Sequence, residues 1–472
     1  MTARAGPPRR REARFTTGST MRHVVVMTLT SMLGLSFMFL VDFVTLFWIG
    51  QIGDPVNVAA VGYAWTIQFF AVSSGIGLSI AAMALIARAI GMRDWRAARQ
   101  HAGASLLIAL VVQGAVALAV LVLRQPLLAV LGASEQALAV AGRFLLITVP
   151  TLPLMALGMV AASGLRAAGD AWRAMTVTLA AGVIALIADP LVIFPRTELL
   201  GGRLAIPFGA GLGMDGAAWV LAATRVVTAG LAIGWLAGVH DLIALPGRAA
   251  LRATARPFFR IALPAMATQM STPVGNAAVT AIIAEFGDAA MAGWSVVSRL
   301  MILAFGGIFA LSGAIGGIIG QNHGAGLAGR VASAYRDAML FSLVYVLAVW
   351  TALALAGGPV IAAFGVTGEG ARVVRAFTEL AAGGFVFTGA LFVANATFNN
   401  LGRPLWSTAF NWTRDLLLMA PLAWAMARLL GAPGAVYGQA LAGVAVGALA
   451  GIVGWRHIAS LQPAAQPRTG PA

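Results

Sequence analysis

Two aspartates stand inside long apolar runs, where a carboxyl group can do chemistry. Asp42 is the only charged residue between Val24 and Gly53, and Asp189 lies late in another run, directly before Pro190. Insertion of an ionised carboxylate at the middle of a bilayer costs roughly 2.5–3.5 kcal/mol. Each side chain should therefore face protein or a wet cavity. Two acids that meet in such a place can take up and release a proton, so we interpret them as a proton or cation site.

Each aspartate also has a purely structural interpretation. Asp42 could cap a kink or pair with a neighbour. Pro190 removes a backbone donor and bends a helix, so Asp189 could cap the broken end. For Asp42 the functional interpretation is favoured, and Asp189 follows it if the two side chains converge.

The elements that carry these acids are membrane spans. The chain has 472 residues, of which 60% are hydrophobic and 10% charged, and its mean hydropathy is +0.88. A soluble domain carries about 25% charged residues. A run of about 20 apolar residues crosses the hydrocarbon core as a helix. The runs predict an all-α membrane protein with 12 transmembrane helices, near 24–49, 56–86, 103–123, 139–160, 174–194, 216–239, 261–284, 290–318, 338–360, 377–398, 406–427 and 434–455.

Composition excludes several functions. The chain has no cysteine, which rules out disulfides, thiolate metal sites and cysteine catalysis. No histidine lies in the middle of a span, which argues against a haem or histidine-metal centre, and we expect no cofactor and no metal site. The net charge of +15 comes from arginines in loops between the runs. We therefore expect no nucleic-acid partner.

The arginines instead predict the orientation. They are about three times as frequent in the loops on the side that holds both termini, which places both termini in the cytoplasm of a multi-pass inner (plasma) membrane protein. We divide the chain into a cytoplasmic tail, a six-helix bundle, a cytoplasmic linker, a second six-helix bundle and a second cytoplasmic tail. Their ranges are 1–21, 22–239, 240–260, 261–456 and 457–472.

The two bundles repeat each other in sequence. Four anchors recur in the same order and at a nearly constant separation along the chain. Since each half has an even number of spans, both halves enter from the same side and form a parallel repeat. In transporters such halves enclose a substrate path and rock against each other. The anchor pairs are Gly53 and Gly287, Gly91 and Gly324, Gly169 and Gly402, and Pro190 and Pro421.

The second half does not copy the two acids. Asn276 stands where the repeat places the counterpart of Asp42, and Ala420 stands opposite Asp189. Coupling should therefore belong to the first half. Gln269 and Asn276 are candidates to line a substrate cavity. So are the aromatic residues Trp65 and Phe69, because the faces of aromatic rings attract flat cations.

Other charged residues lie in or near the spans. For Arg225, Arg299 and the adjacent Arg414 and Asp415, a buried pair or a side chain reaching the interface is favoured. Arg414 and Asp415 should point about 100° apart on a helix and need other partners. Glu379 should lie close to an interface, in contact with water.

Taken together, the residues resemble the multidrug and toxic compound extrusion (MATE) family of cation-coupled efflux transporters. The resemblance covers nearly the whole chain and rests on an ordered set of motifs: VDFVTLFWIGQIG, ARAIGMRDWRAA, SGLRAAGD, IADPLVIF, GQNHGAG and FNNLGRP. It implies two six-helix bundles about a central cavity, with Asp42 and Asp189 as the coupling residues. The family's oxygen donors to sodium are replaced by Ala185 and Leu221. A proton is therefore the expected coupling ion, and sodium is the less favoured one.

The expected function is a proton-coupled antiporter that exports organic cations or other drugs by alternating access. Its partners would be membrane lipid and small organic, cationic substrates, and we expect a monomer. One alternative is a flippase for lipid-linked or polysaccharide precursors, which would need a large basic cavity. A membrane-embedded enzyme is disfavoured, because no acid cluster or sizeable polar loop domain is present.

Overall fold

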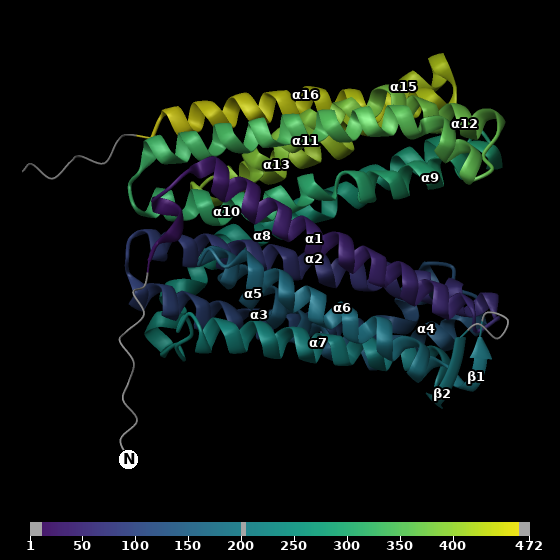
Figure 1. The fold of residues 1–472 in the computed structure, drawn as a ribbon, viewed down its shortest axis with the longest axis horizontal. Coiled ribbons are helices and arrows are strands. Elements are labelled where there is room, and N and C mark those ends of the chain that lie inside the picture. The colour runs from purple at the N-terminus through teal and green to yellow at the C-terminus, as the bar shows by residue number, and fades with distance from the viewer. Residues whose placement is uncertain (1–11, 200–203, 462–472) are drawn as a thin grey trace, which may run out of the picture.

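The computed structural model describes residues 12–199 and 204–461, which form two helical bundles (Figure 1). The first bundle follows a short 3₁₀ turn, η1 (Arg14–Thr16), and ends before the linker. Its elements are α1 (Thr20–Gly50), α2 (Pro55–Gly91), α3 (Trp95–Val130), α4 (Glu135–Thr148), η2 (Val149–Thr151), α5 (Leu152–Ala167), α6 (Ala171–Ile193), β1 (Pro195–Leu199), β2 (Leu204–Ala210) and α7 (Gly213–Gly238).

The second bundle contains more interrupted helices. Its elements are α8 (Arg248–Ala284), α9 (Asp288–Ala304), α10 (Gly306–Gly324), α11 (Ala328–Ala363), α12 (Gly368–Arg375), η3 (Ala376–Leu380), η4 (Ala381–Gly384), α13 (Phe385–Asn400), α14 (Pro404–Trp412), η5 (Thr413–Leu418), α15 (Met419–Leu430) and α16 (Ala432–Ala459). Of these, η3 and η5 are π-helical turns inside longer spans.

These elements form the twelve expected spans. Ten helical stretches are long and apolar enough to cross a membrane. The other two spans are α8, which carries arginines in its first turns and three internal prolines, and the stretch from α14 through η5 to α15. The antiparallel hairpin of β1 and β2 is the one addition to the all-α prediction among the described residues. We call the end of the molecule that carries this hairpin the hairpin end, and the opposite end, at which α1 begins and α16 ends, the tail end (Figure 1).

Equivalent glycines confirm the repeat in three dimensions. Gly53 and Gly287 both have φ of 87°, and Gly169 and Gly402 have φ of 83° and 82°. These left-handed values favour glycine, so the two halves turn their chains in the same way at the same positions.

The third glycine pair lies where the halves cross. A Cβ on Gly91 of α2 would stand 2.0 Å from the carbonyl oxygen of Gln321, and one on Gly324 of α10 would stand 2.1 Å from that of Arg88. Each glycine therefore meets the residue three positions before its own counterpart. This reciprocity places the pseudo-twofold axis between α2 and α10 at the tail end.

The hydrogen bonds between the halves also lie at the tail end. Among the described residues, each hydrogen bond that joins the halves lies there, including those from Gln321 to Ala167 at 2.6 Å and from Thr20 to Asp337. The segment before α1 also joins the two halves at the tail end. Phe15 is 2% exposed, its backbone N–H donates to Gln321, and its carbonyl accepts from Arg330. The last part of the expected first tail is therefore packed against both bundles.

Candidate functional site

Asp42 lies on a helix face of α1 that is buried toward both ends. On a helix, residue Val24 lies five full turns before Asp42, and Ile49 lies about two turns after it. Both are buried: Val24 packs with Leu311 and Ile315 of the second half, and Ile49 packs in an apolar cluster of the first half. Asp42 itself is exposed between these two contacts.

Asp189 lies buried on the neighbouring helix. Its residue is 1% exposed, and its carboxylate accepts a hydrogen bond of 2.5 Å from the hydroxyl of Thr45. Helix α6 continues past Pro190 to Ile193. The carboxylate therefore bonds to the side chain of another helix, in contrast to the interpretation of Asp189 as a cap on a broken helix end.

Thr45 connects the two acids. It lies three residues after Asp42, less than one turn of α1, and its hydroxyl donates to Asp189. The packing of α1 on α6 thus places Asp189 against the turn of α1 that follows Asp42. Sequence reasoning missed Thr45, although a hydroxyl one turn from the single acid of an apolar run is a signal that could have found it.

Ala185 and Leu221, which replace the family's oxygen donors to sodium, both lie among apolar side chains. Ala185 packs with Val41 and Val220 in a small buried cluster between α1, α6 and α7. Leu221 packs against a larger apolar cluster of the first half. Neither position offers an oxygen to a cation beside Asp189.

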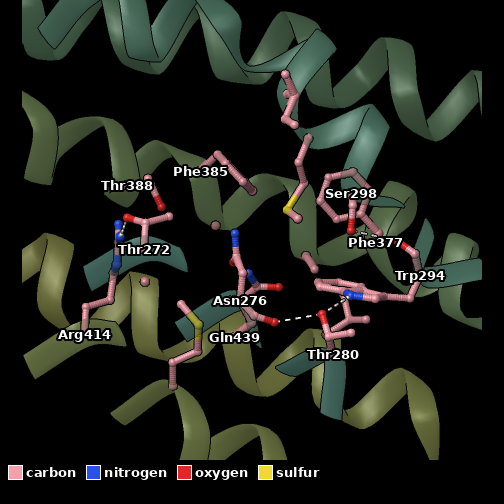
Figure 2. Close-up of a pocket in the computed structure, with 18 of the residues that line it drawn as sticks. Thr272, Asn276, Thr280, Trp294, Ser298, Phe377, Phe385, Thr388, Arg414 and Gln439 are labelled. Carbon is pink, nitrogen blue, oxygen red and sulfur yellow. Dashed lines mark hydrogen bonds between the residues drawn. The ribbon is translucent and has the colours of Figure 1, made fainter. Parts of the chain in front are cut away.

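A separate cavity lies inside the second half (Figure 2). Its volume is about 170 Å³, and it is lined mainly from α8, α9, α13 and α16. Trp294 donates to the hydroxyl of Thr280 at 2.8 Å, and Gln439 donates to the side-chain oxygen of Asn276 at 3.4 Å. Arg414 reaches the opposite wall in Figure 2. The cavity therefore combines aromatic faces, amides, hydroxyls and one cation in its described lining.

The four predicted cavity residues do not gather in one place. Asn276 lines the cavity of the second half. Gln269 lies two turns earlier on α8 and is half-buried, outside that lining. Trp65 and Phe69 lie one turn apart on α2 of the first half, with exposed rings. They contact neither Asn276 nor its cavity, because α2 belongs to the other bundle.

The expectation that Arg414 and Asp415 need other partners is wrong, because they pair with each other. The Nε and Nη2 atoms of Arg414 donate to the two carboxylate oxygens of Asp415 at 2.6 and 3.0 Å. The hydroxyl of Ser271 donates to the same carboxylate at 2.7 Å. The long arginine side chain folds back along the π-helical turn η5, which shortens the reach between neighbours. The pair is buried, with Asp415 fully covered.

The remaining membrane arginines differ in their surroundings. Arg225 is buried and donates to the carbonyl of Thr148 at 2.6 Å and to the side chain of Gln68 at 2.7 Å. It thereby ties α7 to α4 and α2, which agrees with the structural interpretation. Arg299 and Glu379 are exposed, as expected for side chains that reach water.

The fold is that of a two-bundle membrane protein, and two acids in the spans of its first half form no ion pair with any described residue. Comparison with known proteins agrees with that class. A model of the family described as MatE matches the chain twice, over residues 30–191 and 264–425, so that each half carries one match at equivalent positions of the repeat. The chain belongs to the MatE family of membrane transporters and is not an enzyme.

Similar proteins support the same fold. The FAD transporter of Shewanella oneidensis is 27% identical over 414 residues, which are 85% of this chain and 87% of that protein. The structure of a Vibrio cholerae MATE transporter matches with a TM-score of 0.85 and 23% identity, over 93% of this chain and 96% of that one. A MOP superfamily transporter from Pyrococcus furiosus, described by a reverse polarity of its binding pocket, matches with a TM-score of 0.84 and 20% identity, over 95% and 98%.

Proposed function

We propose that this MatE family member is a proton-coupled antiporter whose proton is carried by Asp42 and Asp189. The observation that carries the proposal is the hydrogen bond from Thr45 to Asp189, which ties the buried acid to the turn that holds the exposed one. Neither acid pairs with an arginine among the described residues. A carboxylate without a fixed counter-charge in a low-dielectric site favours its neutral form, so it can accept a proton when one is offered.

The arrangement of the halves supports a route for that proton. The bonds between the halves lie at the tail end, and Asp42 is exposed beyond them toward the hairpin end. With both tails in the cytoplasm, Asp42 would be reached from outside. Protonation of Asp189 would remove the charge that holds the Thr45 hydroxyl and let α1 and α6 repack. This change would favour the state open to the other side, as alternating access requires.

A proton suits the site better than a sodium ion. Hard cations such as calcium take six or more oxygen ligands, and sodium is similarly served by several oxygens. Here Ala185 and Leu221 contribute methyl groups where oxygen donors would be needed. The side-chain oxygens on hand are those of Asp42, Asp189 and Thr45.

The cavity of the second half is our candidate for part of the substrate site. Its volume of about 170 Å³ is smaller than the roughly 300–1,000 Å³ typical of drug sites, so it would hold one ring system while the rest of a substrate lies between the halves. Trp294, Phe377 and Phe385 offer aromatic faces for such a ring. Organic cations or other flat drugs are the substrates that we first propose.

A second substrate class is suggested by the guanidinium in the wall of that cavity. Arg414 is the charged residue in the described lining, and Asp415 accepts from its Nε and Nη2 atoms, so a ligand would meet the remaining nitrogen, Nη1. An arginine beside aromatic rings suits a flat molecule that carries an anionic group. The similar protein from Shewanella oneidensis is named an FAD transporter, and export of a flavin nucleotide is therefore our second candidate.

Transport in inside-out vesicles tests both parts of the proposal. Uptake of a cationic dye and of FAD is measured with a proton gradient and a sodium gradient imposed separately. We expect the proton gradient to raise the flux and Asp42→Asn to abolish that rise. A matched control is the double variant Glu369→Gln/Arg372→Gln, which removes an ion pair outside both sites and should keep the response to the gradient. Stimulation by sodium alone, or a full response to protons in Asp42→Asn, would overturn the proposal.

A further inference from the structure

A second groove lies at the tail end, on the outside of the second half. It has a volume of about 420 Å³ and is formed by the first turns of α8 and by the start of α14. It belongs to neither the acid site nor the cavity around Asn276. Its lining residues are Phe259, Arg260, Leu263, Pro264, Gly402, Arg403, Pro404, Leu405 and Trp406.

The groove is positively charged. Arg260 and Arg403 are exposed, and no carboxylate lies in the described lining. The guanidinium of Arg403 stands 5.4 Å above the ring of Trp406, which orients it without neutralising it. Arg256, one turn before Arg260, is also exposed. Within the described part of the chain these arginines form no ion pair, so an anion would meet unpaired cations.

The apolar part of the lining begins directly below these charges. Leu263 is 58% exposed and Leu405 is 68% exposed. Both leucines lie within a few residues of the start of an apolar run, at 261–284 and 406–427. The groove therefore combines guanidinium groups at the membrane boundary with exposed aliphatic side chains that follow them by two or three residues in the sequence. A phospholipid has the same two parts in the same order.

The equivalent place in the first half is built differently. Asp170 directly follows Gly169, as Arg403 directly follows its counterpart Gly402, so the repeat places the two side chains at matching positions. Asp170 caps α6 by accepting from the backbone of Arg173, and it also pairs with the side chains of Arg173 and His240. Arg403 precedes α14 without any side-chain cap. At matching positions the first half thus carries an acid, Asp170, that is paired with cations, and the second half carries an arginine, Arg403, that forms no ion pair with the described residues.

We propose that the groove binds an anionic phospholipid, with the headgroup phosphate between Arg260 and Arg403. An acyl chain would lie over Leu263 and Leu405. Basic pockets between helices on the cytoplasmic side bind such headgroups, because phosphate accepts charge-assisted hydrogen bonds from arginine. The site would hold the second bundle in the cytoplasmic leaflet while the first bundle moves.

Native mass spectrometry of the full chain tests this site. The protein is exchanged into detergent with dioleoylphosphatidylglycerol or, separately, dioleoylphosphatidylcholine, and bound lipid is titrated. We expect the anionic lipid to bind more tightly, and Arg260→Gln/Arg403→Gln to weaken its binding roughly 30-fold, the factor expected for two arginine–phosphate attractions. Arg403→Lys should keep most of the affinity, since the charge remains.

The matched control removes two other exposed arginines from the same end of the molecule. Arg96→Gln/Arg336→Gln loses the same charge, and it should leave the lipid affinity unchanged. A third arm adds inorganic phosphate, which competes with the lipid if the groove is a free-phosphate site. Equal loss in both double variants, equal binding of the two lipids, or displacement by millimolar phosphate would each overturn the proposal. Thermal unfolding in detergent without added lipid checks that the variants are folded.

Discussion

The contact of α1 with α6 and that of α8 with η5 occupy the same place in the two repeats, yet they hold their acids in opposite ways. The separation of Gly53 from Gly287 makes Asn276 the counterpart of Asp42, and the separation of Gly169 from Gly402, shorter by one residue, makes it the adjacent Gly275. At this second separation Gly182 corresponds to Asp415. Asp42 lies on the first helix of the first half, with Asp189 on the fifth, whereas Asp415 lies on the fifth helix of the second half. In each half the helix packed against that of Asp42 or Asp415 carries a glycine.

The glycines explain how the helices approach. A Cβ on Gly182 would stand 2.5 Å from the ring of Phe37, and one on Gly275 would stand 3.0 Å from Asp415. Asp415 is thereby packed against α8, where Ser271 and Arg414 satisfy its charge. Asp42 has no such partner among the described residues. The same helix contact therefore holds a fixed ion pair in the second half and, among the described residues, leaves Asp42 without a counter-charge in the first.

The largest expected effect breaks the fixed pair. Asp415→Asn leaves Arg414 buried without its counter-charge, and loss of one partner of a buried pair costs about 3–5 kcal/mol. The melting temperature in detergent should fall sharply. The double variant Arg414→Met/Asp415→Leu should recover most of the loss, since it buries no charge. Similar melting of the single and double variants would show that the pair does not stabilise the second half.

Removal of the buried acid in the first half should act on transport instead of stability. Asp189→Asn keeps the size of the side chain and removes the group that titrates. We expect the proton-driven flux to fall at least tenfold, with a melting temperature close to that of the parent chain. The measurement pairs vesicle transport with thermal unfolding of the same preparation. A large loss of stability with normal flux would contradict the proposal, because Asp189 would then stabilise the fold and would not couple transport to protons.

The threonine between the acids gives a smaller and sharper test. Thr45→Val removes the hydroxyl that donates to Asp189 and keeps the shape of the side chain. A hydrogen bond contributes about 1 kcal/mol, so the proton-driven flux should change roughly fivefold. Thr45→Ser, which keeps the hydroxyl, should behave like the parent chain. Equal fluxes in the Val and Ser variants would show that the hydroxyl of Thr45 plays no part in proton coupling.

The smallest effect concerns the two helix starts at the tail end. Burial alone would raise the pKa of Asp170, but hydrogen bonds from His240 and from the backbone and side chain of Arg173 hold that pKa well below its usual range. A carboxyl with a depressed pKa stabilises the folded state above its unfolded pKa of about 4, and the contribution is lost as pH falls through the folded value.

Asp170→Asn should therefore lower stability by about 1 kcal/mol at pH 7, since asparagine still caps the helix. The difference from the parent chain should persist down to about pH 4 and shrink only in stronger acid. Melting in detergent as a function of pH measures this. The same scan on Arg403→Asn should show no such pH dependence, because Arg403 forms no cap or ion pair with the described residues. A pH-independent difference for Asp170→Asn would exclude the charge as the cause.

Several features of the fold followed from residue pattern alone. The apolar runs predicted the spans, and the recurring glycines predicted the repeat, because spacing along a chain is a local property. The run near 290–318 was predicted as one span, and Asp288–Gly324 forms one apolar stretch long enough to cross a membrane. Within it the helix is interrupted at Phe305, which stacks on Phe385 at 3.9 Å between ring centroids, and it resumes at Gly306. That stacking joins residues far apart in the chain, so the apolar pattern alone did not predict it.

The sequence by itself determined that this chain crosses a membrane in two related halves and that two acids, Asp42 and Asp189, lie inside spans of the first half. Those conclusions follow from the cost of charge in hydrocarbon and from the order of residues. Only the tertiary structure decided that Thr45 joins Asp189 to the turn of Asp42, that Arg414 closes on Asp415, and that two arginines share an outer groove. Each of these depends on which helix faces which, and helix packing is decided by side chains far apart in the chain.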